Sequence, residues 1–186
     1  MAFLKRRLRP RLGIRSQPSG NDHVQTPLRL ARALSATLQP SGTILEPCSG
    51  DGHIVRALRP FGVVAWCEIT RGRDFFAWTE HVDWCVGNPP WSRYRAFLAH
   101  ALGVADHVAF VSTLNHFWTK SRRALVRRAG FGLEKIIEFD APREWPSTGF
   151  QLGMVLLTRG YHGPCAVEAL VSYLWPDASE LDLVGR

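Results

Sequence analysis

The sequence has no pair of cysteines with the close spacing of a zinc site. Its four cysteines lie far apart, at positions 48, 67, 85 and 165, whereas structural zinc sites group their ligands in CxxC-like pairs. Three of them lie in apolar, strand-like runs, which is typical of reduced, buried thiols in a cytoplasmic protein. We therefore predict no metal ligands and a cytoplasmic location.

Long apolar segments are also missing. No run approaches the roughly 18 consecutive apolar residues that a membrane-spanning helix requires, and the N-terminus lacks the apolar centre of a secretory signal. The 186 residues suffice for one domain, and a 46% hydrophobic share with ten Phe and seven Trp can fill a core. The sequence therefore predicts a globular protein without a membrane span.

Acidic residues are missing from the first 20 positions. This segment holds Lys5 and five arginines, and it carries six of the seven net positive charges of the chain. We predict that residues 1–20 form a flexible basic arm, which suits a polyanion such as nucleic acid. The alternative is a solubilising tail without a ligand.

Strand-like and helix-like patterns alternate along the rest of the chain, which predicts a parallel sheet with right-handed crossovers. Thr26 is expected to cap the first helix, with Pro27 at its first position. A turn and short strand are expected over 71–76. The last two strands, near 133–139 and 152–158, are joined only by a loop, so we expect them to be antiparallel.

The tetrapeptide Asn88-Pro89-Pro90-Trp91 directly follows a short apolar run. Two consecutive prolines end a helix or a central strand, so the tetrapeptide is expected at the carboxyl end of a buried strand. Open α/β sheets bind their ligands at this edge. The Asn88 amide oxygen and the Pro89 carbonyl are placed to accept from a planar amino group, and Trp91 to stack on its ring. A plain turn is the alternative.

A glycine-bearing loop follows an earlier strand. The loop runs from Glu46 through Pro47, Cys48 and Gly50 to Gly52, and a helix is predicted to leave it. The glycines allow close backbone approach, but the loop lacks the GKS or GKT of a phosphate-binding P-loop and the GxGxxG dinucleotide pattern. On its own it indicates only a site for some nucleotide or nucleoside.

Acidic and aromatic residues follow at the end of the next strand. Glu68 is placed to accept hydrogen bonds from ribose hydroxyls. Asp74 offers an acceptor for an exocyclic amine, and Phe75 offers a ring to stack on. Together with the loop, these residues predict a site for an adenosine without a phosphate chain.

The two motifs together resemble those of amino-methyltransferases. The run over 46–52 is similar to their cofactor loop, and 88–91 is similar to their (D/N)PP(Y/F/W) catalytic motif. Residues 25–27 match the segment that packs near the methionine part of the cofactor. The order, with the cofactor segment first, resembles the N6-adenine DNA methyltransferases over roughly residues 22 to 160.

The resemblance implies an α/β, Rossmann-like class I methyltransferase fold with a mostly parallel central sheet and an antiparallel C-terminal hairpin. It implies a catalytic domain over 21–160, which residues 161–186 extend. The implied cofactor is S-adenosyl-L-methionine, and the implied reaction is methyl transfer to the N6 amino group of adenine in DNA.

The resemblance also implies roles for single residues. The residues implied to contact the cofactor are Gln25, Thr26, Pro27, Glu46, Pro47, Cys48, Gly50, Gly52, Glu68, Asp74 and Phe75. The implied catalytic residues are Asn88, Pro89, Pro90 and Trp91. Trp145 and Phe150 are candidates for the opposite face of the target base, with packing between the antiparallel strands as the alternative.

The chain departs from the family pattern after its last clear strand. DNA methyltransferases with this motif order usually carry a large C-terminal target-recognition region, and only about 26 residues follow Gly160. Either sequence preference is low, or loops, the basic arm or a partner chain supply it. DNA is ranked first as the substrate. RNA N6-adenine, N4-cytosine in DNA, a protein glutamine amide, and nucleic-acid binding on a degenerate scaffold stay open as alternatives.

Overall fold

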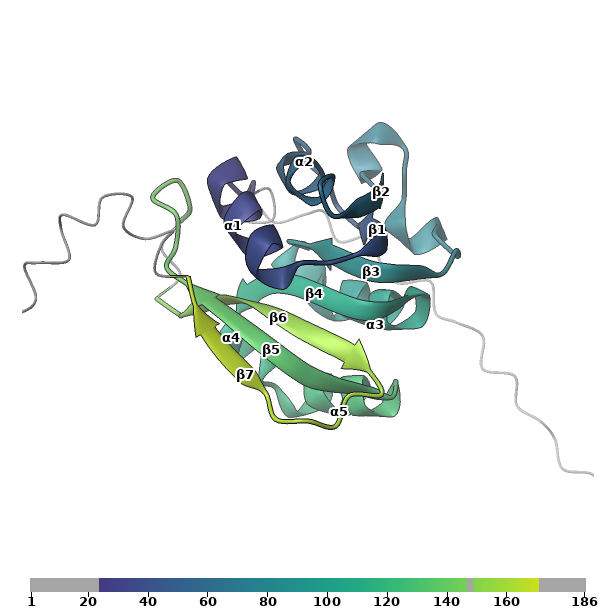
Figure 1. The fold of residues 1–186 in the computed structure, drawn as a ribbon, viewed down its shortest axis with the longest axis vertical. Helices are drawn as coiled ribbons and strands as arrows, with labels where there is room; N and C mark the ends of the chain where they lie inside the picture. The colour runs from purple at the N-terminus through teal and green to yellow at the C-terminus, as the bar shows by residue number, and fades with distance from the viewer. Residues whose placement is uncertain (1–23, 147–148, 171–186) are drawn as a thin grey trace, which may run out of the picture.

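The computed structural model describes residues 24–146 and 149–170. The predicted basic arm of residues 1–20 lies outside the described residues. The described chain forms one seven-stranded sheet in the order β2-β1-β3-β4-β6-β5-β7, with helices on both faces (Figure 1).

Four strands at one end of the sheet run parallel to one another. They are β2 (Gly62–Trp66), β1 (Gly42–Glu46), β3 (Val82–Gly87) and β4 (Ala105–Thr113). The other end contains β6 (Leu152–Arg159), which is antiparallel to both of its neighbours, β4 and β5 (Phe131–Phe139). A last strand, β7 (Ala166–Ala169), pairs with β5 in parallel. The predicted mostly parallel sheet with an antiparallel closing pair is confirmed.

Helices cover the two faces of the sheet. They are α1 (Leu28–Leu38), α2 (His53–Leu58), α3 (Tyr94–Val104), α4 (Leu114–Phe117) and α5 (Lys120–Arg128). Successive side chains of a strand point to opposite faces, so along β4 Val108 and Phe110 join the core cluster with α3, while Ala109 and Val111 join the cluster with α1. No described helix has the length and apolar composition of a membrane span.

The start of α1 differs from the prediction. The helix begins at Leu28, Pro27 occupies the N-cap position with ψ 142°, and no side chain caps the helix. Thr26 therefore lies one residue too far upstream to reach the first free N–H groups. Its hydroxyl instead accepts a hydrogen bond from the Asn88 side chain at 3.2 Å.

The segment after β2 also differs from the prediction. In place of a short strand it forms two 3₁₀ turns, η2 (Ile69–Arg71) and η3 (Phe75–Ala77). The Glu68 side chain accepts from the Thr70 N–H and the Asp74 side chain from the Phe76 N–H, so each acid caps the turn that follows it. Side-chain capping of this kind favours turns over extended structure. A third turn, η4 (Trp91–Arg93), follows the prolines.

Candidate active site

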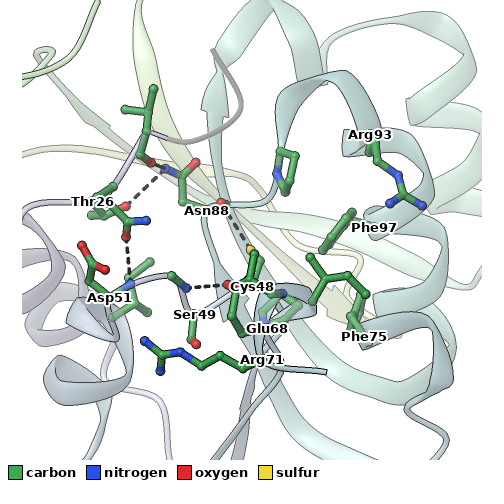
Figure 2. Close-up of a pocket in the computed structure, with 18 of the residues that line it drawn as sticks. Thr26, Cys48, Ser49, Asp51, Glu68, Arg71, Phe75, Asn88, Arg93 and Phe97 are labelled. Carbon is green, nitrogen blue, oxygen red and sulfur yellow. Dashed lines mark hydrogen bonds between the residues drawn. The ribbon is translucent and has the colours of Figure 1, made fainter. Parts of the chain in front are cut away.

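A cavity of about 280 Å³ opens where β1, β2 and β3 end. Four segments far apart in the sequence supply its wall, within residues 24–26, 47–54, 68–76 and 88–97. Parallel strands end at the same edge of a sheet, so the loops that leave them meet there. Figure 2 shows Thr26, Asn88, Cys48 and Glu68 around this space.

The backbone N–H groups of the loop after β1 donate hydrogen bonds to other atoms of the protein. Five consecutive N–H groups donate to protein acceptors: Cys48 to Glu46 Oε1 (3.3 Å), Ser49 to the Cys67 carbonyl (2.8 Å), Gly50 to Glu68 Oε2 (2.8 Å), Asp51 to Gln25 Oε1 (3.2 Å) and Gly52 to the Ser49 carbonyl (2.7 Å). A loop that cradles phosphates keeps such groups free for the anion. This loop therefore suits a ligand that places no phosphate against it.

Two glycines permit the close approach of segments around the loop. Gly50 has φ +47°, and a Cβ there would lie 2.4 Å from the side-chain amide of Gln25. A Cβ on Gly87, the last residue of β3, would lie 2.8 Å from Glu46 Oε1. An added methyl group at either position would force its neighbours to move, and the positive φ of Gly50 disfavours a side chain there as well.

Glu68 joins the loop to the turn that follows β2. Its Oε2 accepts from the Gly50 N–H at 2.8 Å, and its Oε1 accepts from the Thr70 N–H at 3.0 Å and the Thr70 hydroxyl at 2.7 Å. Partial burial works to raise the pKa of Glu68, but these bonds and the positive charge of Arg71 outweigh it, and the pKa is lowered. Glu68 is therefore an ionised acceptor whose Oε2 keeps a second lone pair for a ligand.

Aromatic rings form the wall beyond Glu68. Phe75 is 2% exposed and stacks on Phe97 with ring centroids 5.2 Å apart. The Arg93 guanidinium lies 4.8 Å from the centroid of the Phe76 ring. Asp74 is exposed at the start of η3, where its Oδ1 accepts from the Phe76 N–H at 3.0 Å. This part of the cavity combines flat apolar surface with an acid.

Glu46 lies behind the cavity wall. It is fully buried at the end of β1, and among the described residues its Oε2 has no hydrogen-bond partner. Burial raises the pKa of Glu46 well above its usual value, and the hydrogen bonds from Cys48 oppose this only in part. Pro47 and Cys48, rather than Glu46, line the cavity.

The Asn88 amide is oriented by the segment over 24–26. Its Nδ2 donates to Thr26 Oγ1 at 3.2 Å and to the Val24 carbonyl at 3.4 Å. A backbone carbonyl only accepts, so the bond to Val24 identifies which end of the amide is nitrogen. Among the described residues no donor reaches Asn88 Oδ1, so the residue brings an available acceptor to the cavity wall.

The segment over 24–26 is itself anchored by residues far along the chain. The buried Trp145 donates from its indole N–H to the Gln25 carbonyl at 2.8 Å, and its ring packs against Phe139. Arg29 pairs with Glu144 at 3.1 Å. A buried indole N–H needs a partner, and here that partner fixes the position of Gln25.

Most of the predicted site residues meet at the cavity. Those that line it are Gln25, Thr26, Pro47, Cys48, Gly50, Glu68, Asp74, Phe75, Asn88 and Pro90. Those outside its lining are Pro27, Glu46, Gly52, Pro89, Trp91, Trp145 and Phe150. In particular, Trp145 is buried behind Gln25 and is not placed to face a bound base. Phe150 is 58% exposed.

The structure adds lining residues that sequence reasoning did not single out. Val24, His53, Arg71, Arg93 and Phe97 also belong to the wall. For Arg93 and Phe97 a signal was present, because they follow the tetrapeptide within two helical turns. No sequence pattern pointed to His53, because the hydrogen bond that holds its Nδ1 2.9 Å from the Thr26 carbonyl joins residues that are far apart in the chain.

Comparisons with known proteins identify the fold. No protein-family model matches the chain, and no curated protein sequence matches it. A solved protein from Listeria monocytogenes, provisionally described as a class I S-adenosylmethionine-dependent methyltransferase, superposes with a TM-score of 0.61. The match covers 88% of this chain and 71% of that protein at 13% identity. The chain has the Rossmann-like class I methyltransferase fold.

Two further solved proteins share this methyltransferase fold. One from Pyrococcus horikoshii, provisionally described as an RNA methyltransferase, matches with a TM-score of 0.53 and 15% identity, over 72% of this chain and 82% of its own. A modification subunit of a provisionally assigned type I restriction enzyme from Vibrio vulnificus matches with a TM-score of 0.54 and 12% identity, over 76% of this chain and 45% of its own. Identities this low establish the fold alone.

Proposed function

We propose that the chain transfers a methyl group from S-adenosylmethionine to the exocyclic N6 amino group of adenine in DNA. The orientation of Asn88 carries the proposal. Val24 and Thr26 hold its amide nitrogen, so its oxygen is the atom available to a substrate at the end of β3. An acceptor held in this way suits the N–H of an amino group.

The cavity fits an adenosine cofactor without phosphates. The N–H groups of the loop over 48–52 are committed within the protein. Glu68 offers an ionised acceptor to ribose hydroxyls, and the ring of Phe75 belongs to the apolar wall against which adenine would pack. The Listeria protein is provisionally described as S-adenosylmethionine-dependent, which supports S-adenosylmethionine as the cofactor. S-adenosylmethionine would supply an electrophilic methyl group on a sulfonium.

The residues after β3 would activate the target amine. The lone pair of an aromatic amine is delocalised into its ring, so the amine is a poor nucleophile. Asn88 Oδ1 and the Pro89 carbonyl would accept its two hydrogens and favour a tetrahedral nitrogen whose lone pair points at the methyl carbon. The N–C bond forms as the C–S bond breaks, sulfur keeps the electron pair, and the amine then releases a proton to water. Positioning for this in-line displacement supplies much of the catalysis.

The choice of DNA rests on the resemblance of the two motifs and their order. The Vibrio relative is named as a modification subunit, which also supports a partner chain that supplies target recognition. The Pyrococcus relative is provisionally named for RNA, so RNA N6-adenine is the second candidate substrate.

Transfer of labelled methyl from S-adenosylmethionine to DNA, RNA and protein fractions tests the proposal, with mass spectrometry of the released nucleosides. We expect N6-methyladenine in the DNA fraction. Asn88→Ala should lower the rate at least 100-fold, the usual effect of losing one positioned polar contact to the reacting group, while calorimetry still detects cofactor binding.

Asn115→Ala is the matched control, because Asn115 is exposed and outside the cavity lining. It should keep the rate of the unchanged chain. Undiminished transfer by the Asn88 variant would refute the assignment of the site. Label found only in RNA, in 4-methylcytosine or in protein glutamine would show that the substrate is that molecule and not adenine in DNA.

A further inference from the structure

The start of α5 exposes a basic and aromatic surface. Trp118 is 46% exposed, and Lys120 and Arg123 are exposed beside it in sequence. We call these three residues the Trp118 surface. Residues 107–133 contain no Asp or Glu, and no described residue forms an ion pair with Lys120 or Arg123. The positive charge of this surface is therefore not neutralised locally.

Arg122 has a different role from its neighbour Arg123. It is half-buried, donates to the His116 carbonyl, and holds its guanidinium 5.5 Å from the centroid of the Tyr94 ring. These contacts tie α5 to α4 and α3. Arg122 therefore supports the Trp118 surface without belonging to it.

The sheet topology places this surface beside the cavity. β4 pairs with β3 in parallel, so α4 and the start of α5 leave the same edge of the sheet as Asn88, one strand further along. Contacts also connect the two places: Arg93 lines the cavity, and the ring of Tyr94, the next residue, lies 5.8 Å from the ring of His116 in α4. Trp118 follows His116 by two residues.

The chemistry of the surface matches a nucleic-acid strand. Arg123 holds its guanidinium 5.5 Å from the centroid of the Trp118 ring, and almost half of the Trp118 side chain stays open. Proteins bind single strands by combining cations for the phosphates with aromatic rings on which bases stack. An acidic protein would use the cations but not the exposed indole.

We propose that the Trp118 surface binds the nucleic-acid strand next to the base that enters the cavity, with Trp118 stacking on a base and with Lys120 and Arg123 contacting phosphates. The proposal rests on the proposed function for its polymer class. Phosphate, sugar and base are common to DNA and RNA, and the test includes both.

The test is fluorescence anisotropy of labelled single-stranded DNA and RNA oligonucleotides with the full chain, over a series of salt concentrations. The variants are Trp118→Ala, Trp118→Phe, and the double change Lys120→Ala with Arg123→Ala. The matched control is Arg127→Ala with Arg128→Ala, which removes the same charge from exposed positions of the same helix, about 10 Å further along its axis.

We expect Trp118→Ala to weaken binding about tenfold without changing the salt slope, and Trp118→Phe to retain most of the affinity. The Lys120/Arg123 variant should lower the slope of log K against log salt by about 1.4, the value for two phosphate contacts on a single strand. The Arg127/Arg128 variant should bind within about twofold of the unchanged chain.

Equal losses in the two double variants would overturn the proposal, because they would show a general charge effect. Unchanged binding by Trp118→Ala in a folded chain would also overturn it. Calorimetry with S-adenosylhomocysteine separates this result from failure of the proposed function, since the surface variants should bind that ligand as the unchanged chain does. A chain that binds the cofactor product but neither polymer would refute both the surface and the nucleic-acid substrate.

Discussion

The two sides of the cavity differ in how their hydrogen-bonding groups are arranged. On the side of the loop over 48–52, protein donors and acceptors are bonded to one another, and Glu68 links the loop to the turn at Thr70. On the side of Asn88, the bonds from residues 24–146 and 149–170 hold the amide by its nitrogen, and no donor among those residues reaches its oxygen. One side is a preformed wall, and the other presents a single oriented group.

The two sides of the cavity therefore contribute differently: one determines the shape of the site, and the other determines its hydrogen-bonding chemistry. A wall whose backbone N–H groups are already paired selects a ligand by its contour and by the few acceptors left over, as at Glu68. An oriented amide selects a hydrogen-bond donor at one place. Changes on the wall should therefore act on cofactor affinity and folding, and changes around Asn88 should act on the methyl-transfer rate.

Gly50→Ala should have the largest effect on the wall. The left-handed backbone costs an L-residue about 1–2 kcal/mol, and the new methyl group would displace the Gln25 amide, which lies 2.4 Å from its position. We expect cofactor affinity to fall at least tenfold and the free energy of unfolding to fall by about 2 kcal/mol, measured by calorimetry and urea unfolding.

Gly52→Ala is the control for Gly50→Ala. Gly52 has φ +79°, but nothing lies within 4 Å of its Cβ position. It should show the backbone cost alone, with cofactor affinity close to that of the unchanged chain. Equal losses of affinity in the two variants would mean that displacement of Gln25 is irrelevant.

Thr26→Val tests the other side and should have a smaller effect. Valine keeps the shape but removes the acceptor for Asn88 Nδ2, and losing one such hydrogen bond costs about 1–1.5 kcal/mol. We expect the methyl-transfer rate at saturating cofactor to fall about tenfold. Thr26→Ser keeps the hydroxyl and should restore most of the rate. A rate loss in both variants would show that packing, and not the hydrogen bond, matters.

The titration of Glu68 should have the smallest effect. Its pKa in the folded chain lies below the ordinary value of 4.5, so its ionised form stabilises the fold above pH 4.5, and this contribution is lost as the pH falls through the lower folded value. Unfolding measured between pH 6 and pH 3 should show this loss in the unchanged chain and less of it in Glu68→Gln. Identical pH profiles would contradict the lowered pKa.

The sequence predicted the alternation of strands and helices better than the part of the sheet that departs from it. Apolar runs such as the one before Asn88 identify buried strands, because a strand between two layers of helices has few polar positions. The order in which the strands pair at the end of the sheet that contains β6 could not be predicted from the sequence. β6 pairs with both β4 and β5 and so lies between them, and the sequence carries no local sign of which strands it will pair with.

The sequence singled out the cavity-lining acids Glu68 and Asp74. Glu68 comes two residues after β2, and Asp74 lies further along, beyond the turn η2. Sequence reasoning misplaced Thr26, whose local preference for a helix cap lost to a bond with Asn88, 62 residues away. It also offered Trp145 as a base contact, since an aromatic residue in a loop carries no sign of which surface it will face. In the structure Trp145 is buried against Phe139.

The bond from Trp145 to Gln25 joins residues 120 positions apart. During synthesis, the strands and the loop that face the cofactor emerge well before Trp145 does. Until Trp145 has been synthesised, its hydrogen bond to the segment that orients Asn88 is missing. A nascent or truncated chain that stops before residue 140 therefore lacks this anchor of the segment that orients Asn88. The site proposed for methyl transfer is therefore completed only when Trp145, which follows Asn88 by 57 positions in the chain, has been synthesised.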